Sequence, residues 1–246
     1  MRKRLLYLLS ALVIAIAGTL TASVVAPSEA AADGCYTWDR TLREGARGSD
    51  VTQLQIRIAG WVASGENLAL DGVFGPATAR AVKRFKSAYG LNNDSVAGPA
   101  VFSKIYALQD NDCTPAHFAY SEMNDNCGAN NFNGGKVSAT TAKRNTLRMM
   151  WQLEAMRHKL GDRPMVVSIS FRSVSCNSAV GGASNSRHMY GQATDFSTRS
   201  GPTLCQMYHA AKTSGFEEIL GPGYPGHNDH THVANDSTRT WSAPNC

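Results

Sequence analysis

Residues 186–195 of the chain read SRHMYGQATD and contain two candidate metal ligands, His188 and Asp195. The two lie seven positions apart, which is too far for one helical face at i,i+4 spacing. A tight turn at Gly191 between two extended pieces would bring both side chains to one point, and residues 192–197 have the pattern of a strand. The segment therefore indicates a site built on a turn and a strand.

Residues 227–232, HNDHTH, form a second group of histidines near the C-terminus. His230 and His232 alternate by two, so on a strand they share a face and both could bind a metal ion. A Gly/Pro-rich turn at 221–226 precedes this stretch, and residues 233–234 continue it as a strand. Three nitrogen or oxygen ligands with one open position are typical of a catalytic zinc site. Spacing alone leaves open that HNDHTH is an exposed tract with incidental metal affinity.

The residues around these two groups alternate between helix and strand patterns. Ser138 can cap a long helix that continues to Leu160, where Gly161 fits the C-terminal cap. Strands are predicted at 165–171, 192–197, 216–220 and 230–234, with a loop at 176–187 and a helix at 202–214. Mixed helices and short strands of this kind indicate an α+β domain with an antiparallel sheet.

The chain before residue 113 has a different pattern, that of a small all-α domain. Its first helix can be capped by Ser49 or Asp50. A second helix begins near Pro76, a favoured first-turn residue, and a third follows Gly98-Pro99. The apolar positions expected to face inward are Val51, Leu54, Ile58, Ala77, Ala81, Val82 and Phe85. Three such helices would enclose one modest core.

Four parts of the chain follow from these patterns. Residues 1–32 have a basic start, a short apolar run and an Ala-x-Ala site, as a secretory signal peptide does. The apolar run is shorter than the roughly 20 residues that a membrane-spanning helix needs. Residues 33–113 form the three-helix domain, 114–135 a linker rich in Asn, Asp and Gly, and 136–246 the α+β domain. The mature protein is expected to be secreted and free of the membrane.

The six cysteines are an even number in an exported chain and indicate three disulfides. The simplest pairing, among others that stay open, is sequential: Cys35–Cys113, Cys127–Cys176 and Cys205–Cys246. A catalytic cysteine beside a histidine is disfavoured because an oxidising compartment would consume the thiol. The net charge of +5 is mild and evenly spread, which argues against nucleic-acid binding.

Three motifs in the second part resemble those of the zinc D-alanyl-D-alanine carboxypeptidase family. That family also includes D-alanyl-D-alanine dipeptidases and phage endolysin endopeptidases, and shares a fold with the hedgehog signalling domain. The motifs are Ser-x-His-x-x-Gly-x-Ala-x-Asp at 186–195, Asp-His-x-His at 229–232, and the strand-ending stretch ISFRS at 169–173. The resemblance covers roughly residues 127–246.

This resemblance implies one Zn²⁺ per chain, bound by His188, Asp195 and His232, with water in the fourth place. Asp229 would be the general base that takes a proton from the zinc-activated water and returns it to the leaving amine. His230 and His227 would line the site as hydrogen-bond donors or proton carriers. Arg172 would face the substrate and hold a terminal carboxylate or an oxyanion, unless it forms only a surface salt bridge.

Residues 41–105 resemble the three-helix peptidoglycan-binding module. The resemblance is carried by LREGARGSDV at 42–51 and by DGVFGPAT at 71–78. It implies core positions at Leu54, Phe74, Val82 and Phe85, and a turn at Gly72 and Gly75. In modules of this kind a glutamine commonly follows the phenylalanine, whereas here Lys86 follows Phe85. Whether this copy binds glycan or only positions the second domain stays open.

Together, the two resemblances imply a secreted, cell-wall-associated D,D-carboxypeptidase that removes the terminal D-Ala from peptidoglycan stem peptides, expected as a monomer. One alternative is an endopeptidase that cuts cross-links or stems with the same zinc chemistry. Another is a non-catalytic wall-binding protein with a structural zinc. A penicillin-sensitive serine carboxypeptidase is excluded, because that class needs Ser-x-x-Lys and the chain contains no such tetrapeptide.

Overall fold

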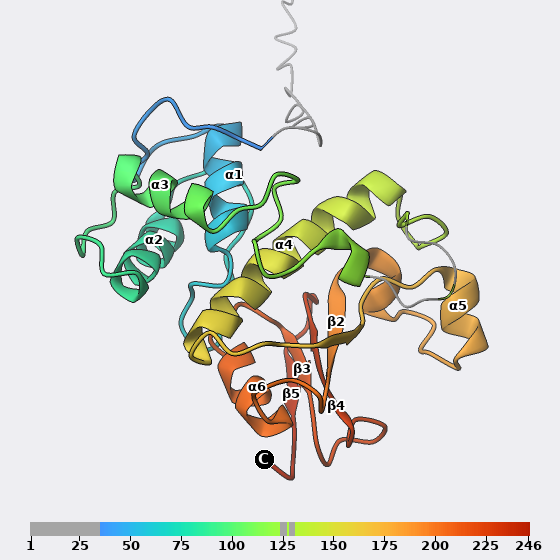
Figure 1. Cartoon of the computed structure of the whole chain (residues 1–246). Helices are drawn as coiled ribbons and strands as arrows, with labels where there is room; N and C mark the ends of the chain where they lie inside the picture. The colour runs from blue at the N-terminus through green and yellow to red at the C-terminus, as the bar shows by residue number, and fades with distance from the viewer. Residues whose placement is uncertain (1–34, 124–126, 128–130) are drawn as a thin grey trace, which may run out of the picture.

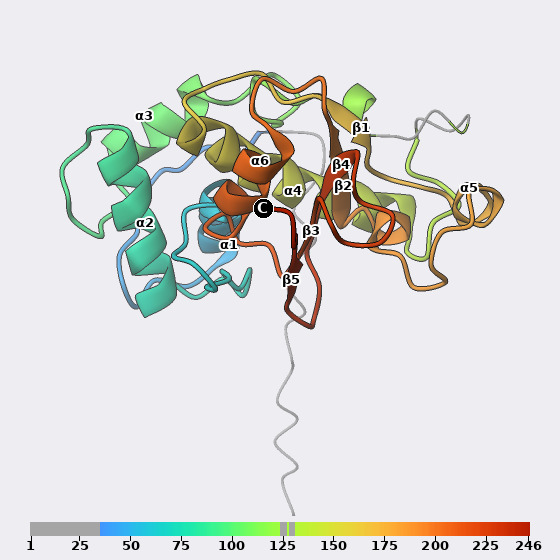
Figure 2. The ribbon, with the colours of Figure 1, turned by 90° about the horizontal axis from the view of Figure 1, so that it is seen from below.

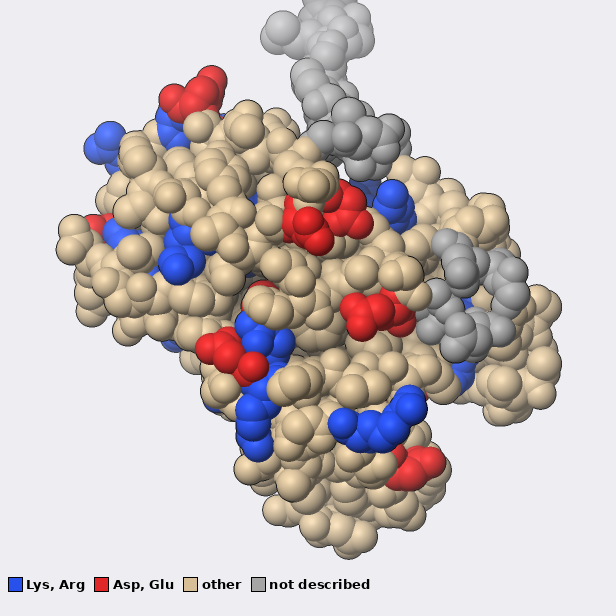
Figure 3. All heavy atoms as spheres, in the orientation of Figure 1, with Lys and Arg blue, Asp and Glu red and all other residues tan. Residues whose placement is uncertain are grey.

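The computed structural model describes residues 35–123, 127 and 131–246. The predicted signal peptide, residues 1–32, lies outside the described residues. Within the described part, none of the helices combines the length and the apolar character needed to cross a membrane. On the face shown in Figure 3, acidic and basic side chains are interspersed, and neither sign forms an extended patch.

Three helices make up the N-terminal part, namely α1 Ser49–Ile58, α2 Pro76–Ala88 and α3 Pro99–Ala107 (Figure 1). Both α2 and α3 begin at a proline, as predicted. The N-cap of α1 is Gly48, so the prediction that Ser49 or Asp50 caps it is wrong. Gly48 has φ 140°, a conformation that favours glycine, and Asp50 instead pairs with Arg40 at 2.6 Å.

The core of this part contains the residues that the motif predicted. Leu54, Phe74, Val82 and Phe85 are all buried. Ala77 is exposed, contrary to the prediction, and the next residue, Thr78, is buried in its place. The Thr78 hydroxyl accepts a hydrogen bond from Gln55 at 3.1 Å, so the polar side chain is satisfied inside the core.

Helix α4, Ala139–Lys159, lies between α1 and the sheet (Figure 1). Its ends match the prediction: the Ser138 hydroxyl accepts a hydrogen bond from the Thr141 amide, and Gly161 is left-handed at φ 75°. The helix is buried on two sides. Trp151 and Ala155 belong to the core of the three helices, whereas four other residues belong to the core under the sheet, namely Met149, Met150, Leu153 and Met156.

The two parts of the chain approach closely where α1 ends. A Cβ at Gly60 would lie 2.5 Å from the Ala155 Cβ and 2.9 Å from the Gln152 Cα, so only glycine allows this contact with α4. The segment predicted as a linker also packs against the second core, through Phe118, Met123 and Phe132. The domain limits given by the sequence stay a prediction.

The sheet has five strands in the order β1-β2-β4-β3-β5. Their bounds are β1 Val167–Ile169, β2 Ala193–Ser197, β3 Glu218–Leu220, β4 His230–Ala234 and β5 Thr240–Ser242. Three of the four pairings are antiparallel, as predicted, and β5 adds a parallel pairing to β3 that was not predicted. The predicted α+β class is confirmed.

One face of this sheet is covered and the other carries polar groups. Phe196, Ile219 and Val233 pack into the core with α4 and with helix α6, Leu204–Ala211, which Figure 2 shows on the same side of β2 and β4. Because side chains alternate along a strand, the neighbouring residues Asp195 and His232 face the other way. The sheet therefore presents these two residues away from the main core.

The segment from 174 to 190 differs from the predicted loop. It contains helix α5, Val174–Ala179, and the 3-10 helix η2, Arg187–Tyr190. A further 3-10 helix, η1, lies earlier in the chain, at Tyr120–Glu122. The Ser173 hydroxyl starts α5 by accepting the Cys176 amide at 3.1 Å. Strand β1 and helix α6 are shorter than predicted, since β1 has an irregular register with β2 and Thr203 caps α6.

The three disulfides pair as predicted. Cys35–Cys113, Cys127–Cys176 and Cys205–Cys246 have Cα–Cα distances of 5.0, 5.9 and 5.2 Å, within the usual range. The last bridge ties the C-terminal residue to α6, and Figure 2 shows the C-terminus beside that helix. Cys35–Cys113 and Cys205–Cys246 each lie within one predicted domain, whereas Cys127–Cys176 ties the predicted linker to the second domain.

Candidate metal centre

Two strands and one turn bring the predicted ligands together. Asp195 on β2 lies directly opposite His232 on β4 in the antiparallel register. His188 lies in η2, which ends at Gly191 in the left-handed conformation, φ 66°. The predicted turn at Gly191 is thus present, but His188 lies in a 3-10 turn and not in an extended piece. A Cβ at Gly191 would lie 2.5 Å from the Ala142 carbonyl, so α4 leaves room only for glycine here.

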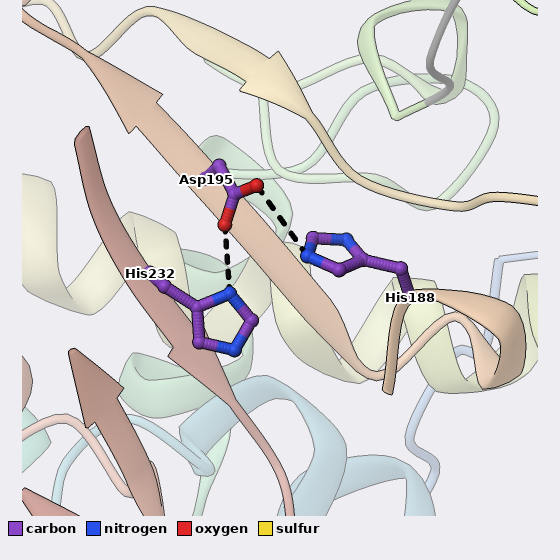
Figure 4. A group of neighbouring side chains, drawn as sticks. All are labelled: His188, Asp195 and His232. Carbon is purple, nitrogen blue, oxygen red and sulfur yellow. Dashed lines mark hydrogen bonds and ion pairs between the residues drawn. The ribbon is translucent and has the colours of Figure 1, made fainter. Parts of the chain in front are cut away.

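The three side chains form one compact buried group (Figure 4). Asp195 Oδ1 lies 2.7 Å from His232 Nδ1, and Asp195 Oδ2 lies 3.4 Å from His188 Nε2. Their ligand atoms all lie within 4.8 Å of one another, and all three residues are buried. Among the described residues, this is the one group of three or more such side chains with that geometry.

Each histidine of the group is held from its far side. His188 Nδ1 lies 2.6 Å from the Ser170 carbonyl, and His232 Nε2 lies 2.9 Å from Glu218 Oε1. A carbonyl and a carboxylate accept hydrogen bonds, so these two nitrogens are the ones that carry protons. The remaining nitrogens, His188 Nε2 and His232 Nδ1, face the Asp195 carboxylate, and a metal ion bound between them would take the place of any proton there. Two such nitrogens and a carboxylate are a donor set that fits zinc.

The electrostatics of the group favour a positive charge. Burial raises the pKa of Asp195, but the charges and hydrogen bonds of His188 and His232 hold it well below its usual range. Burial lowers the pKa of His232, but the hydrogen bonds to Asp195 and Glu218 raise it to about 9. A buried imidazole that retains its proton near pH 9 shows that its surroundings stabilise a cation. A proton can fill that role, and so can a metal ion.

Arg172 lies beside the three residues. Its Nη2 is 4.0 Å from Asp195 Oδ2, its side chain is only 13% exposed, and its amide donates to the His188 carbonyl at 3.1 Å. This position is at the edge of the buried group and not on the open surface, where a simple surface salt bridge would form. The guanidinium therefore faces the same space as the ligand atoms.

The other predicted residues lie at the start of β4 and just before it. The rings of His227 and His230 lie 4.6 Å apart, and His227 lies 5.8 Å from the His232 ring. Burial lowers the pKa of His227. Asp229 is exposed over 88% of its side chain and accepts a hydrogen bond from His230 Nδ1 at 2.8 Å. That hydrogen bond lowers the pKa of Asp229, so the carboxylate is ionised at neutral pH.

Sequence reasoning missed Glu218. The residue lies in the stretch FEEIL, where strand alternation places it on the face opposite Ile219. This pattern could have placed Glu218 on the polar face of a strand. Its contact with His232 depends on β3 and β4 being neighbours in the sheet, which the sequence pattern alone does not give.

Family models match both parts of the chain. The model described as Peptidase M15 matches residues 116–234, and the model described as a putative peptidoglycan binding domain matches residues 47–105. The chain is 60% identical over 230 residues to the zinc D-Ala-D-Ala carboxypeptidase of Streptomyces albus G, a match that covers 94% of this chain and 89% of that protein.

Weaker similarities cover shorter segments. A probable N-acetylmuramoyl-L-alanine amidase of Bacillus licheniformis is 35% identical over 106 residues, which cover 38% of this chain and 29% of that protein. Among solved structures, a Burkholderia AP3 phage endolysin is 31% identical in sequence to this chain. The match covers 44% of this chain and 37% of the endolysin, with a TM-score of 0.25.

Proposed function

Since this chain belongs to the peptidase M15 family, with a zinc D-Ala-D-Ala carboxypeptidase as a 60% identical relative, we propose that it removes the terminal D-Ala from peptidoglycan stem peptides. The predictions of family, enzyme class and zinc as the cofactor are confirmed by this relationship. The observation that carries the proposal is the buried His188–Asp195–His232 group, in a chain that is similar to that relative over nearly its whole length.

We infer that His188, Asp195 and His232 hold the zinc. Both histidines are oriented by partners on their far sides, and the carboxylate lies between them. Zn²⁺ bound there supplies a Lewis acid that polarises the scissile carbonyl and makes a water molecule more acidic. The surrounding side chains then bind the peptide and move its protons.

Arg172 and Asp229 fit two of these tasks. The Arg172 guanidinium borders the group and can hold the terminal carboxylate of the substrate with two parallel hydrogen bonds. Asp229 is ionised and can accept a proton from the attacking water and return it to the leaving amine. His230 orients the Asp229 carboxylate, and the His227 ring contacts the His230 ring in a tilted arrangement.

The N-terminal part supports a cell-wall location. The match to a peptidoglycan-binding domain at 47–105 suggests that this part holds the enzyme on its polymeric substrate. We propose that the protein is exported with residues 1–32 as its signal peptide, is released from the membrane when that segment is cleaved, and acts in the wall as a monomer.

A metal analysis combined with a two-substrate assay tests this function. We expect one zinc per chain, and loss of one D-Ala from a free pentapeptide that ends in D-Ala-D-Ala. A cross-linked muropeptide should stay intact, and its cleavage would instead identify an endopeptidase. A chelator should abolish the activity and added zinc should restore it, whereas a β-lactam should act poorly. Activity that persists after thorough metal removal would overturn the proposal.

A further inference from the structure

Glu218 reaches the metal centre from the neighbouring strand. In the β3–β4 register, Glu218 pairs with Ala234 and Leu220 pairs with His232, so Glu218 is the diagonal neighbour of His232 on the same face. Diagonal neighbours are about 7–8 Å apart at Cα, a gap that a long side chain can bridge. Glu218 Oε1 does so and lies 2.9 Å from His232 Nε2.

This contact decides how the His232 ring is presented. The carboxylate accepts the proton on Nε2, so Nδ1, which faces Asp195 (Figure 4), is the nitrogen that would lose its proton and give its lone pair to a metal ion. Without such a partner, the ring could exchange its tautomer or turn about its side-chain bonds. His188 has the same kind of support from the Ser170 carbonyl, which no substitution can remove. Only on His232 is the support a side chain.

Glu218 is not itself placed to bind the metal. It contacts Nε2, and the two ring nitrogens of an imidazole point in diverging directions, so its carboxylate lies behind His232 as seen from the ligand atoms. The Glu218 side chain is 27% exposed and His232 only 8%, so the carboxylate lies between the buried ring and the solvent.

We propose that Glu218 is a positioning residue of the metal centre, which fixes the orientation and tautomer of His232 and thereby sets the zinc affinity. The inference rests on the proposed function, because it takes His232 as a zinc ligand through Nδ1. Partners of this kind commonly contribute about tenfold to a hundredfold in metal affinity.

Glu217 provides a matched control. It precedes Glu218 on the same stretch, is 8% exposed, and accepts a hydrogen bond from the Asp236 amide at 3.2 Å. Because side chains alternate along the strand, Glu217 and Glu218 face opposite sides. Glu217→Gln therefore changes charge and hydrogen bonding one position away, without touching His232.

The test measures the dissociation constant for zinc by competition with a chromogenic chelator, and the Tm of each metal-free protein. We expect Glu218→Ala to weaken zinc binding by about tenfold to a hundredfold. Glu218→Gln should lie between Glu218→Ala and wild type, because its amide oxygen can still accept the Nε2 proton. Glu217→Gln should bind zinc as wild type does. The metal-free Tm shows whether each variant is still folded at the temperature of the zinc titration, so that a weaker affinity can be assigned to the ligand and not to unfolding.

Two results would overturn the inference, and they have different consequences. If wild type binds zinc tightly and Glu218→Ala binds it within twofold of Glu217→Gln, Glu218 is not a positioning residue and the proposed function still stands. If wild type binds no zinc, the proposed function and this inference both fail. A Glu218→Gln variant as weak as Glu218→Ala would show that charge, and not orientation, is what His232 needs, and would contradict the role stated here.

Discussion

Asp195 and His232 lie directly opposite each other on neighbouring antiparallel strands, and their side chains meet at 2.7 Å. The centre therefore depends on the register of β2 and β4, which a slip of one residue would destroy by turning one of the side chains to the other face. Two of the four predictions that follow concern side chains at this centre, and two concern the segment that carries His188.

Asp229→Asn is expected to lower the rate of D-Ala release by about a hundredfold or more, because a general base contributes roughly 10²–10⁴. Zinc content should stay at the wild-type level, since Asp229 contacts His230 and is mostly exposed. Asp162→Asn is the matched control: Asp162, just beyond the C-terminal end of α4, is also exposed and pairs with a histidine, His158, at 3.1 Å. A loss of less than tenfold with zinc still bound would contradict the role of Asp229.

Arg172→Ala should remove the preference for a free C-terminal carboxylate. Wild type is expected to cleave a pentapeptide acid about tenfold to a hundredfold better than its C-terminal amide, as a charged hydrogen bond of about 1.5–3 kcal/mol implies. The measurement is kcat/KM for both peptides in both proteins. If the variant keeps the wild-type ratio, Arg172 does not hold the carboxylate.

Gly191→Ala should destabilise the protein by about 1–3 kcal/mol more than Gly181→Ala. Both glycines are left-handed, with φ 66° and 71°, so both substitutions carry the conformational cost. Only at Gly191 would the added Cβ meet α4, 2.5 Å from the Ala142 carbonyl, whereas Gly181 has open space. Urea unfolding measures the difference. Equal losses in the two variants would show that η2 can shift away from α4.

Asp236 should make stability depend on pH in the acid range. It forms two hydrogen bonds with Arg187, at 2.7 and 2.6 Å, and this pairing lowers the pKa of Asp236 to about 2. The pKa of Asp236 in the folded state lies below the unfolded value of 3.8. The contribution of the Asp236–Arg187 pair to the free energy of unfolding is therefore present above about pH 4 and is lost as the pH falls towards 2.

The size of that contribution is about 2 kcal/mol, and Asp236→Asn should remove it. Unfolding free energies of wild type and variant should therefore differ at pH 7 and converge towards pH 2. Arg187 precedes His188, so the variant should also bind zinc less tightly at neutral pH. A gap between the two proteins that stays constant from pH 7 to pH 2 would contradict the assignment of the effect to this pair.

Local signals in the sequence predicted most of the framework. Ser138 and Gly161 mark the ends of α4 because their hydrogen-bonding and left-handed preferences act within a few residues. The bounds of β4 were predicted from the run HTHVA after a Gly/Pro turn, and agree with the structure. The helix α5 was missed because its start depends on a single serine cap and it is only six residues long.

Contacts between distant segments were harder to predict. Glu218 meets His232 only because β3 is inserted next to β4, and β5 adds a parallel pairing at the edge. Gly48 caps α1 because the Asp50 side chain is engaged by Arg40. In each of these positions, a tertiary partner decides among options that are locally equivalent.

Helix α4 fixes the position of the metal centre relative to the three N-terminal helices. Because Trp151 and Ala155 complete one core while Met149, Leu153 and Met156 complete the other, a single helix joins the three-helix part to the peptidase part. The metal centre is therefore held at a fixed distance and a fixed angle from the three N-terminal helices, which a flexible linker between two separate cores would not provide.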